Sequence, residues 1–162
     1  MPARKYPQAH SLAIGRVSKF TFVEFRDAAG KINGADLLRS VVEAFPYAIH
    51  TVLTDNGMAF ADLPKNRGRS SAMEAMFGGH IFNRVCKEHG VLHKLTKPYH
   101  SWTNGQAEHM NRTVKEATVK AFHYRDLESL KAQILAFVSA YNFAKHLKAI
   151  LWKTPFEAIC QA

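Results

Sequence analysis

The stretch LTDNG, residues 53–57, places the carboxylate of Asp55 between an apolar run and the turn-forming pair Asn56-Gly57. The preceding run, IHTVLT at residues 49–54, is typical of a buried strand. Open α/β sheets bind their ligands at the carboxyl ends of strands, which is where we expect Asp55 to lie. The alternative is that Asp55 begins an Asx turn with Asn56-Gly57 and has only that local role.

The sequence on both sides of this strand alternates between strand and helix patterns. Before it, residues 11–25 predict a hairpin whose turn is VSK, and residues 35–45 predict an amphipathic helix that ends at Pro46. After it, we expect a mobile basic loop at 61–79, a helix at 80–90, a strand at 91–96, a loop at 97–105, and helices at 106–124, from Asp126 onward and at TPFEAIC. This order predicts an α/β fold with a mixed sheet flanked by helices.

Charge is the most informative property of the composition. The 162 residues carry 22 Lys and Arg against 13 Asp and Glu, so the net charge is 22 − 13 = +9. A basic chain favours polyanionic partners, because each neutralised phosphate releases condensed counterions. With no run of about 20 apolar residues and no secretion signal in its first ten residues, the chain is expected to be cytoplasmic and to have no membrane partner.

A second carboxylate stands at the start of the helix predicted from residue 106. Glu108 is followed by Asn111, Arg112 and Lys115, at positions i+3, i+4 and i+7, so the four share one helix face. Glu108 could hold a divalent ion there while the amide and the two cations orient a DNA backbone. The alternative is a simple ion pair between Glu108 and Arg112.

The loop ahead of Glu108 is both basic and aromatic. Trp102, with Lys94 and Lys97 nearby, could stack on or clamp a DNA end. The alternative is that Trp102 packs over the edge of the core.

Three stretches of the chain carry a resemblance to a known family: VLTDNGMAF, LHKLTKPYHSWTNGQAEHMNRTVKE and AYNFAKHL followed by TPFEA. They resemble the integrase core of DDE transposases, in particular bacterial insertion-sequence transposases related to retroviral integrases, from about Leu12 to Ile159. The resemblance implies an RNase H-like fold and strand-transfer chemistry on transposon ends and target DNA, with two Mg²⁺ or Mn²⁺ ions. It implies that Asp55 is the second catalytic aspartate and metal ligand, and that Glu108 is the catalytic and metal-binding glutamate.

The chemistry explains why such a family uses carboxylates. A water or a 3′-hydroxyl attacks phosphorus in line, and negative charge grows on the entering and leaving oxygens. Two metal ions about 3.5 to 4 Å apart can stabilise both oxygens. Mg²⁺ prefers hard oxygen ligands, which Asp and Glu provide.

The sequence also departs from the family pattern. The first acid of the triad is missing, because residues 1–10 contain no carboxylate and Gly15 stands where many relatives have Asp. The only carboxylates before the predicted helix at 35–45 are Glu24 and Asp27, and ILWKTP replaces a turn that usually contains glycine in the resembled family. We therefore expect the first strand of the fold to be missing, the hairpin to have an exposed edge that promotes homo-oligomers, and the chain alone to be inactive or nearly so.

These expectations define a basic tail at 1–10 and an integrase-like core at 11–162, with C-terminal helices from about 126. The leading hypothesis is a transposase or integrase core acting in DNA integration by metal-dependent strand transfer. Two alternatives remain: a DNA-binding remnant of a transposase without catalysis, and an unrelated RNase H-like nuclease or structural protein whose two carboxylates lie far apart.

Overall fold

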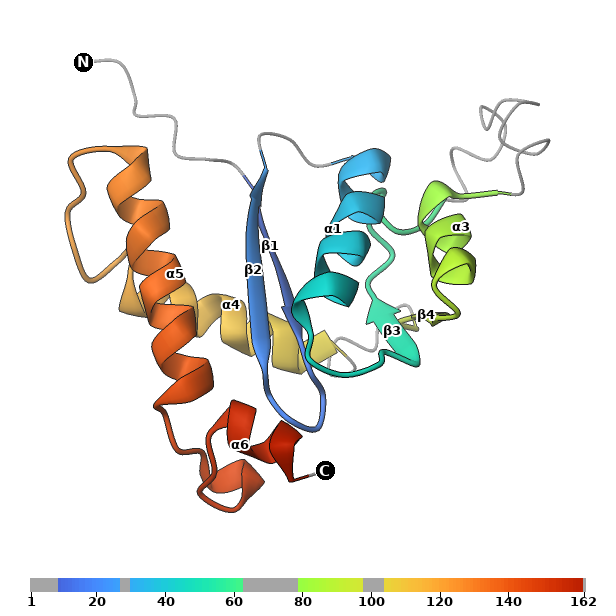
Figure 1. The fold of residues 1–162 in the computed structure, drawn as a ribbon. Helices are drawn as coiled ribbons and strands as arrows, with labels where there is room; N and C mark the ends of the chain where they lie inside the picture. The colour runs from blue at the N-terminus through green and yellow to red at the C-terminus, as the bar shows by residue number, and fades with distance from the viewer. Residues whose placement is uncertain (1–8, 27–29, 63–78, 98–103, 162) are drawn as a thin grey trace. The chain divides into compact units, whose positions relative to one another are not determined.

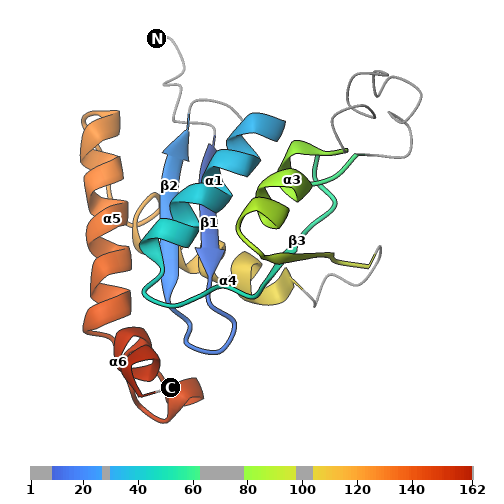
Figure 2. The ribbon, with the colours of Figure 1, turned by 45° about the vertical axis from the view of Figure 1, so that its right-hand side comes forward.

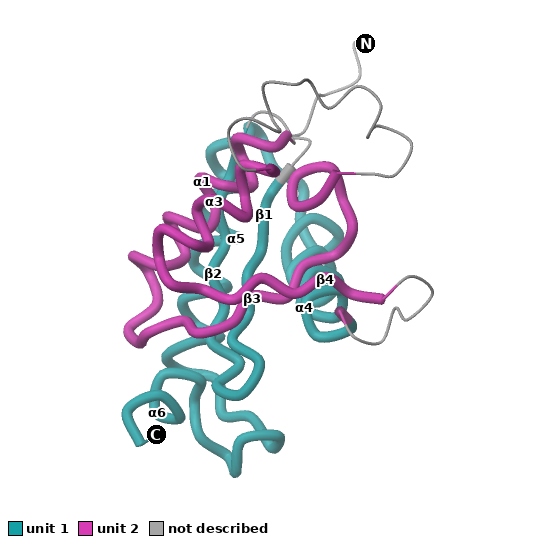
Figure 3. Tube along the Cα trace, turned by 90° about the vertical axis from the view of Figure 1, so that its right-hand side faces the viewer, with its two compact units in different colours: residues 1–27, 105–162 teal, residues 28–104 magenta. Residues whose placement is uncertain are grey.

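The computed structural model describes residues 9–26, 30–62, 79–97 and 104–161 (Figure 1). The chain divides into two compact units, which Figure 3 distinguishes by colour. Unit 1 combines Met1–Asp27 with Gly105–Ala162, and unit 2 is Ala28–Asn104. Each unit has its own small sheet, its own helices and its own apolar core.

The hairpin of unit 1 consists of β1, Ala9–Ile14, and β2, Thr21–Arg26. The strands are antiparallel, with Ser11 opposite Glu24. Between them, the Lys19 N–H donates to the Gly15 carbonyl over 2.8 Å, and Lys19 has a φ of 64°, which reverses the chain. The predicted hairpin and its turn are confirmed.

The helices of unit 1 are α4, Gly105–Ala117; α5, Leu127–Phe143; and α6, Pro155–Cys160, with the short 3-10 helix η3, Lys148–Ile150, before the last. Figure 2 shows α5 running alongside β2. The buried core of this unit is formed by Val23, Met110, Val114, Leu130, Ile134 and Val138. Because these residues come from β2, α4 and α5, burial of their side chains holds the hairpin against both helices.

Two of the helix ends in unit 1 follow the expected local chemistry. Asp126 begins α5 by accepting a hydrogen bond from the Ser129 N–H over 2.7 Å. Thr154 begins α6 in a capping box with Glu157, and Pro155 occupies the first turn. Both predicted helix starts are confirmed.

A side-chain amide joins the hairpin of unit 1 to α5. Asn142, which is buried, accepts a hydrogen bond from the Thr21 N–H over 2.9 Å and donates one to the Thr21 carbonyl over 2.7 Å. Both backbone groups of Thr21 are thereby satisfied inside the protein, which buried groups of this kind require.

Unit 2 contains α1, Lys31–Ala44; β3, Thr51–Thr54; α3, Ile81–Glu88; and β4, Leu92–Leu95. β3 and β4 are parallel, with Thr54 opposite Leu95. Between them, α3 begins at His80, whose ring accepts from the Phe82 N–H, and the chain turns at Gly90, which has a φ of 66°. The predicted helix at 80–90 and the strands on either side are confirmed.

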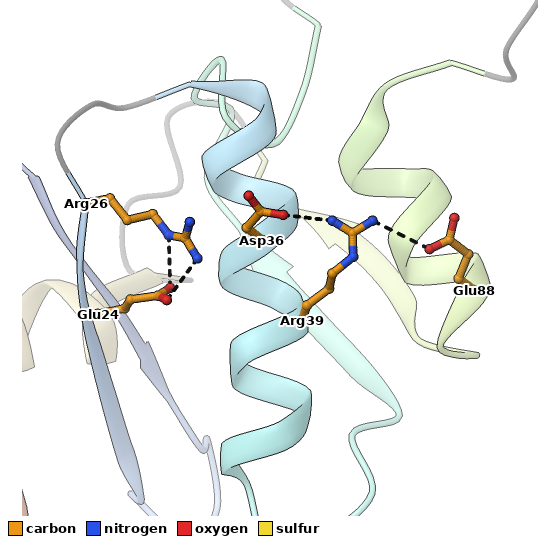
Figure 4. Close-up of polar contacts among 5 residues, drawn as sticks. All are labelled: Glu24, Arg26, Asp36, Arg39 and Glu88. Atoms are coloured by element: carbon orange, nitrogen blue, oxygen red, sulfur yellow. Dashed lines mark hydrogen bonds and ion pairs between the residues drawn. The ribbon is translucent and has the colours of Figure 1, made fainter.

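The core of unit 2 lies between α1, α3 and the start of β4, and it consists of Ala35, Leu38, Phe82, Val85, Cys86 and Val91. On the surface, Arg39 of α1 contacts Asp36 at 2.8 Å and Glu88 of α3 at 3.8 Å, as Figure 4 shows. Ion pairs of this exposure contribute about 0 to 1 kcal/mol, so the apolar core provides most of the stability.

Several boundaries differ from those expected. The helix predicted at 35–45 begins at Lys31, and the helix predicted at 106–124 ends at Ala117. The strand expected to be buried at 49–54 is shorter, and only Thr54 in it is buried. The predicted basic loop at 61–79 falls mostly on 63–78, outside the described residues.

None of the helices in the described ranges combines the length and the apolar character that a membrane crossing needs.

Candidate functional site

Asp55 directly follows β3, and its side chain is exposed. Its Oδ1 accepts a hydrogen bond from the Gly57 N–H over 2.9 Å, so the Asx turn considered from the sequence does form. Within the described ranges, no ion pair neutralises Asp55. The turn fixes one carboxylate oxygen at a strand end and leaves the charge open to a cation.

Gly57 is the residue that lets the Asp55 carboxylate take this position. A Cβ added at Gly57 would lie 2.9 Å from Asp55 Oδ1, closer than real Cβ atoms approach other atoms. Any larger residue would therefore displace the carboxylate or the backbone that holds it.

The ring of His93 and the side-chain amide of Asn56 hold the end of β3 in place. His93 of β4 contacts the Thr54 hydroxyl through Nε2 at 2.8 Å and the Asn83 side-chain oxygen through Nδ1 at 2.5 Å. The Asn56 side chain donates to the Thr96 carbonyl over 3.0 Å. The residues on both sides of Asp55 are thus tied to β4 and to the chain that follows it.

The His93 ring is held in a partly apolar setting. It packs edge-on against Phe82, with ring centroids 4.7 Å apart. Burial lowers the pKa of His93 below its ordinary value of 6.5, and the nearby His80 lowers it further. The neutral ring is therefore favoured, and with it the pair of polar contacts to Thr54 and Asn83.

Glu108 lies in the first turn of α4, and it is exposed on the side away from the buried Met110 and Val114. A carboxylate in the first turn interacts favourably with the helix dipole. The ion pair with Arg112 is absent from the described part of the chain.

The other members of the predicted helix face differ in setting. Arg112 and Lys115 are exposed, but Asn111 is half-buried and its Oδ1 lies 2.8 Å from Nε2 of His10 in β1. The Asn111 side chain therefore helps to join α4 to β1. Arg112 and Lys115 remain available to an anionic partner.

The lysines predicted to bind DNA in unit 2 are also exposed: Lys94 lies in β4 and Lys97 follows it. Trp102 lies outside the described residues. Its two alternatives, stacking on DNA or packing on the core, stay predictions.

The two carboxylates belong to different units, Asp55 to unit 2 and Glu108 to unit 1, and each is described in its own unit. Their sharing of a metal ion remains a prediction. Searched over the described ranges alone, the structure shows no group of three or more His, Cys, Asp or Glu side chains arranged to hold a metal ion.

Glu24 and Asp27 are the carboxylates before α1 that could stand in for the first acid of the resembled family. Glu24 on β2 is held by Arg26, whose Nε and Nη2 donate to its two carboxylate oxygens over 3.0 and 2.9 Å (Figure 4). A carboxylate engaged on both oxygens is a poor candidate for a metal ligand. Asp27 lies outside the described residues.

Sequence reasoning missed the supporting residues His93 and Asn142. The alternating pattern of residues 91–96 indicates a strand, but it carries no signal that the His93 ring would reach Thr54. Asn142 stands in an apolar helix pattern, and an amide in such a pattern is a signal for a buried hydrogen-bonding partner.

Comparison with known proteins gives a family-model match, a curated relative and similar solved structures. Residues 89–155 match the family model described as the integrase core domain. An uncharacterized protein of Caenorhabditis elegans is 26% identical over 141 residues, which cover 86% of this chain and 9% of that protein.

One structural match is to a chain in the cryo-electron microscopy structure of the simian T-cell lymphotropic virus intasome in complex with PP2A regulatory subunit B56 gamma. The TM-score is 0.67 at 15% identity, and the match covers 92% of this chain and 47% of that chain. The expected mixed α/β, RNase H-like fold is confirmed, with its described strands paired as two small sheets. Residues 89–155 are thus similar to an integrase core domain, and the fold resembles that of the matched intasome chain.

Proposed function

We propose, on the premise of an integrase-type core, that residues 11–162 act in DNA integration and transposition by metal-dependent phosphodiester strand transfer. The observation that carries this proposal is the setting of Asp55 and Glu108. Both carboxylates are exposed and without an ion-pair partner among the described residues, although cations outnumber acids in the chain. Carboxylates left open in a basic protein are suited to holding a divalent cation.

The donor chemistry of these residues fits Mg²⁺ or Mn²⁺. Asp55 and Glu108 offer hard oxygen ligands, and among the described residues a single Asp55 oxygen is engaged, by the Gly57 N–H. We propose that they hold the two ions expected of the family, which when bound would stabilise charge on the entering and leaving oxygens. The Asx turn and the contacts of Thr54 and His93 would keep Asp55 in place while DNA binds.

Cationic side chains provide the means to bind the substrate. We propose that Arg112 and Lys115 of α4, and Lys94 and Lys97 in and after β4, contact DNA phosphates. Asn111 and Trp102 are proposed as further DNA contacts, Asn111 through the part of its amide that His10 leaves open. Binding through phosphates predicts an affinity that falls steeply with salt.

The experiment is a titration of Mn²⁺ into the protein, followed by proton relaxation of bound water. Asp55→Asn and Glu108→Gln are each expected to weaken Mn²⁺ binding about 10- to 100-fold, because each removes a charged ligand. Glu116→Gln is the matched control, since Glu116 is an exposed acid of the same helix that faces Lys120 at 4.0 Å. Equal Mn²⁺ affinity in all four proteins would overturn the proposal.

A nicking assay with supercoiled DNA and Mn²⁺ provides the second readout. Any activity of this chain is expected to be weak, and to be lost in Asp55→Asn and in Glu108→Gln. Equal nicking by the unchanged protein and both variants would mean a contaminating nuclease.

A second candidate function is DNA binding without catalysis. It is favoured by the double engagement of Glu24 by Arg26, which removes one replacement for the first acid. In that case the protein would bind DNA with a steep salt dependence, and neither Mn²⁺ nor Asp55→Asn would change the affinity.

Assembly and location follow from the same proposal. We propose that the chain self-associates through the hairpin edge, and that it works where its DNA lies, which for a bacterial protein is the cytoplasm. Light scattering over a range of concentrations measures the assembly directly, and a monomer at every concentration would exclude self-association.

A further inference from the structure

The segment between α5 and α6 forms a small closed loop, residues 147–153, here called the 147–153 loop. Its two ends pair in an antiparallel bridge, in which the Leu147 N–H donates to the Lys153 carbonyl over 3.0 Å. The Trp152 N–H donates back to the Leu147 carbonyl over 2.9 Å. These hydrogen bonds close the base of the loop and hold its tip, Leu151-Trp152, in a defined conformation.

The tip presents two large apolar side chains to solvent. Leu151 is 81% exposed and Trp152 is 66% exposed. Large apolar side chains in consecutive exposed positions are a usual sign of a binding surface.

The backbone of the tip is strained. Leu151 and Trp152 both have a φ of 59°, in the left-handed region that glycine enters without cost and other residues avoid. Strain of this kind is found where function maintains a conformation that stability disfavours.

The surroundings of the tip are basic. Residues 141–162 contain Lys145, Lys148 and Lys153 but a single acid, Glu157, a local charge of 3 − 1 = +2. The Glu157 carboxylate is already engaged by the Thr154 N–H in the capping box, and this hydrogen bond lowers its pKa. Lys145 and Lys148 are exposed.

We propose that the 147–153 loop is a binding site for single-stranded nucleic acid. The Trp152 ring would stack on an unpaired base, the Leu151 side chain would lie against a neighbouring base or sugar, and Lys148 and Lys153 would contact phosphates. Stacking of an exposed aromatic ring beside cations is the recurring means of binding single strands. A protein partner would need about 800 Å² on each side, far more than a two-residue tip offers.

This inference extends the proposed DNA function, because strand transfer exposes unpaired ends, but it uses none of the proposed metal ligands. The two proposals can therefore fail separately. A protein that binds single strands but not Mn²⁺ would contradict the catalytic proposal and leave the loop site standing. A protein that binds Mn²⁺ but not single strands would contradict the loop site and leave the catalytic proposal standing.

The experiment measures fluorescence anisotropy of a labelled oligothymidylate of about 16 nucleotides, at low salt and with a metal chelator present. Trp152→Ala is expected to weaken binding about 5- to 150-fold, the range of one base–aromatic stack. Phe122→Ala is the matched control, because Phe122 is an exposed aromatic of the same unit beside Lys120 and His123. We expect it to change the affinity by less than about twofold.

Trp152→Gly separates binding from folding. Glycine relieves the strain at a φ of 59°, so this variant should melt at a higher temperature than the unchanged protein while binding the oligonucleotide as weakly as Trp152→Ala. If Trp152 affected binding only through the stability of the fold, the more stable Trp152→Gly variant would bind the oligonucleotide at least as tightly as the unchanged protein.

Three results would overturn the inference. One is an unchanged affinity in Trp152→Ala, and another is an equal loss of affinity in Phe122→Ala. The third is a change from dimer to monomer in Trp152→Ala with oligonucleotide binding intact, which would assign the tip to contact between copies of the chain.

Discussion

The Thr54 hydroxyl lies 2.8 Å from Nε2 of His93, and this contact joins the last residue of β3 to its parallel neighbour β4. Thr54 immediately precedes Asp55, so the contact sits one residue from the proposed metal ligand. The Thr54 hydroxyl oxygen also lies 3.1 Å from the Asp55 carbonyl. The His93 ring therefore helps to fix the position of the backbone that carries the Asp55 side chain.

Protonation of His93 should destabilise the fold. Burial lowers the pKa of His93 in the folded state below 6.5, so the unfolded chain binds the proton more readily. The stability contribution is full above pH 6.5 and is lost as the pH falls toward the folded pKa. Urea unfolding between about pH 7 and pH 5 measures it, and His93→Gln should reduce the dependence of stability on pH over that range.

His89→Gln provides the matched control, because His89 is an exposed histidine at the end of α3. It should leave the pH dependence of the unchanged protein intact. The same slope in His93→Gln as in the unchanged protein would contradict the assignment of this titration to His93.

Gly57→Ala should impair metal binding more than folding. The new Cβ would lie 2.9 Å from Asp55 Oδ1, so the carboxylate must move, and it can do so because it is exposed. Displacement of a catalytic group by about 1 Å can cost about 100-fold in rate. We expect the Mn²⁺ affinity, and any Mn²⁺-dependent nicking, to fall about 10- to 100-fold with little change in melting temperature.

Gly30→Ala is the control for glycine replacement in the same unit. A Cβ at Gly30 would have open space around it, with no atom within 4 Å. If both glycine variants lose the same activity, the effect does not come from the Asp55 carboxylate.

Asn142→Ala should be strongly destabilising. The change removes both partners of the Thr21 backbone, whose residue is only 2% exposed. An unsatisfied buried polar group costs about 1 to 3 kcal/mol, and here two are created. Urea unfolding should show a loss of about 2 to 6 kcal/mol, whereas Gln133→Ala, at an exposed position of the same helix, should stay within about 0.5 kcal/mol.

The two cysteines should differ in reactivity. Both are free, Cys86 buried and Cys160 exposed. Burial raises the pKa of the Cys86 thiol to about 11, so little thiolate forms near neutral pH. Mass spectrometry after treatment with iodoacetamide should find one modified cysteine in the folded protein, Cys160, and both after denaturation. Rapid modification of Cys86 in the folded protein would mean that the core of unit 2 opens easily.

Most elements of the fold could be predicted because their signals are local. The start of α5 depends on Asp126 and the start of α6 on Thr154 and Pro155, and each acts within its own turn. The chain reversal at Gly90 likewise needs only the positive φ that glycine allows.

The errors in the predicted helix boundaries arose where contacts outside the local sequence pattern determine the structure. Asn33-Gly34 is typical of a turn, yet Gly34 lies inside α1, where a Cβ would collide with the carbonyl of Ala59. The helix α4 ends at Ala117, and the hydroxyls of Thr118 and Tyr124 bond to carbonyls near this end. The Thr118 hydroxyl donates to the Val114 carbonyl over 2.6 Å, and the Tyr124 hydroxyl donates to the Thr118 carbonyl over 3.0 Å.

The candidate site divides in the same way. The Asx turn at Asp55 is a contact between residues two apart, and it was foreseen as an alternative. The hydrogen bond between Asn111 and His10 joins residues 101 positions apart, so nothing in the helix pattern of Asn111 could reveal it. Residue type, spacing and the family resemblance predicted the two acids as site residues, but they gave no indication of the side chains that hold the backbone around them.

The bond between Asn142 and Thr21 also limits how the hairpin can grow. The Asn142 amide is bonded to the two backbone groups that an added strand would need in order to pair with β2 at Thr21. It therefore prevents strand pairing at that position of the β2 edge. Any strand that extends the ribbon at this end, whether from the same molecule or another, must therefore add along β1. The hairpin can therefore gain a strand on one side at this end. Two copies of the chain that pair as strands near Thr21 would have to do so through their β1 edges.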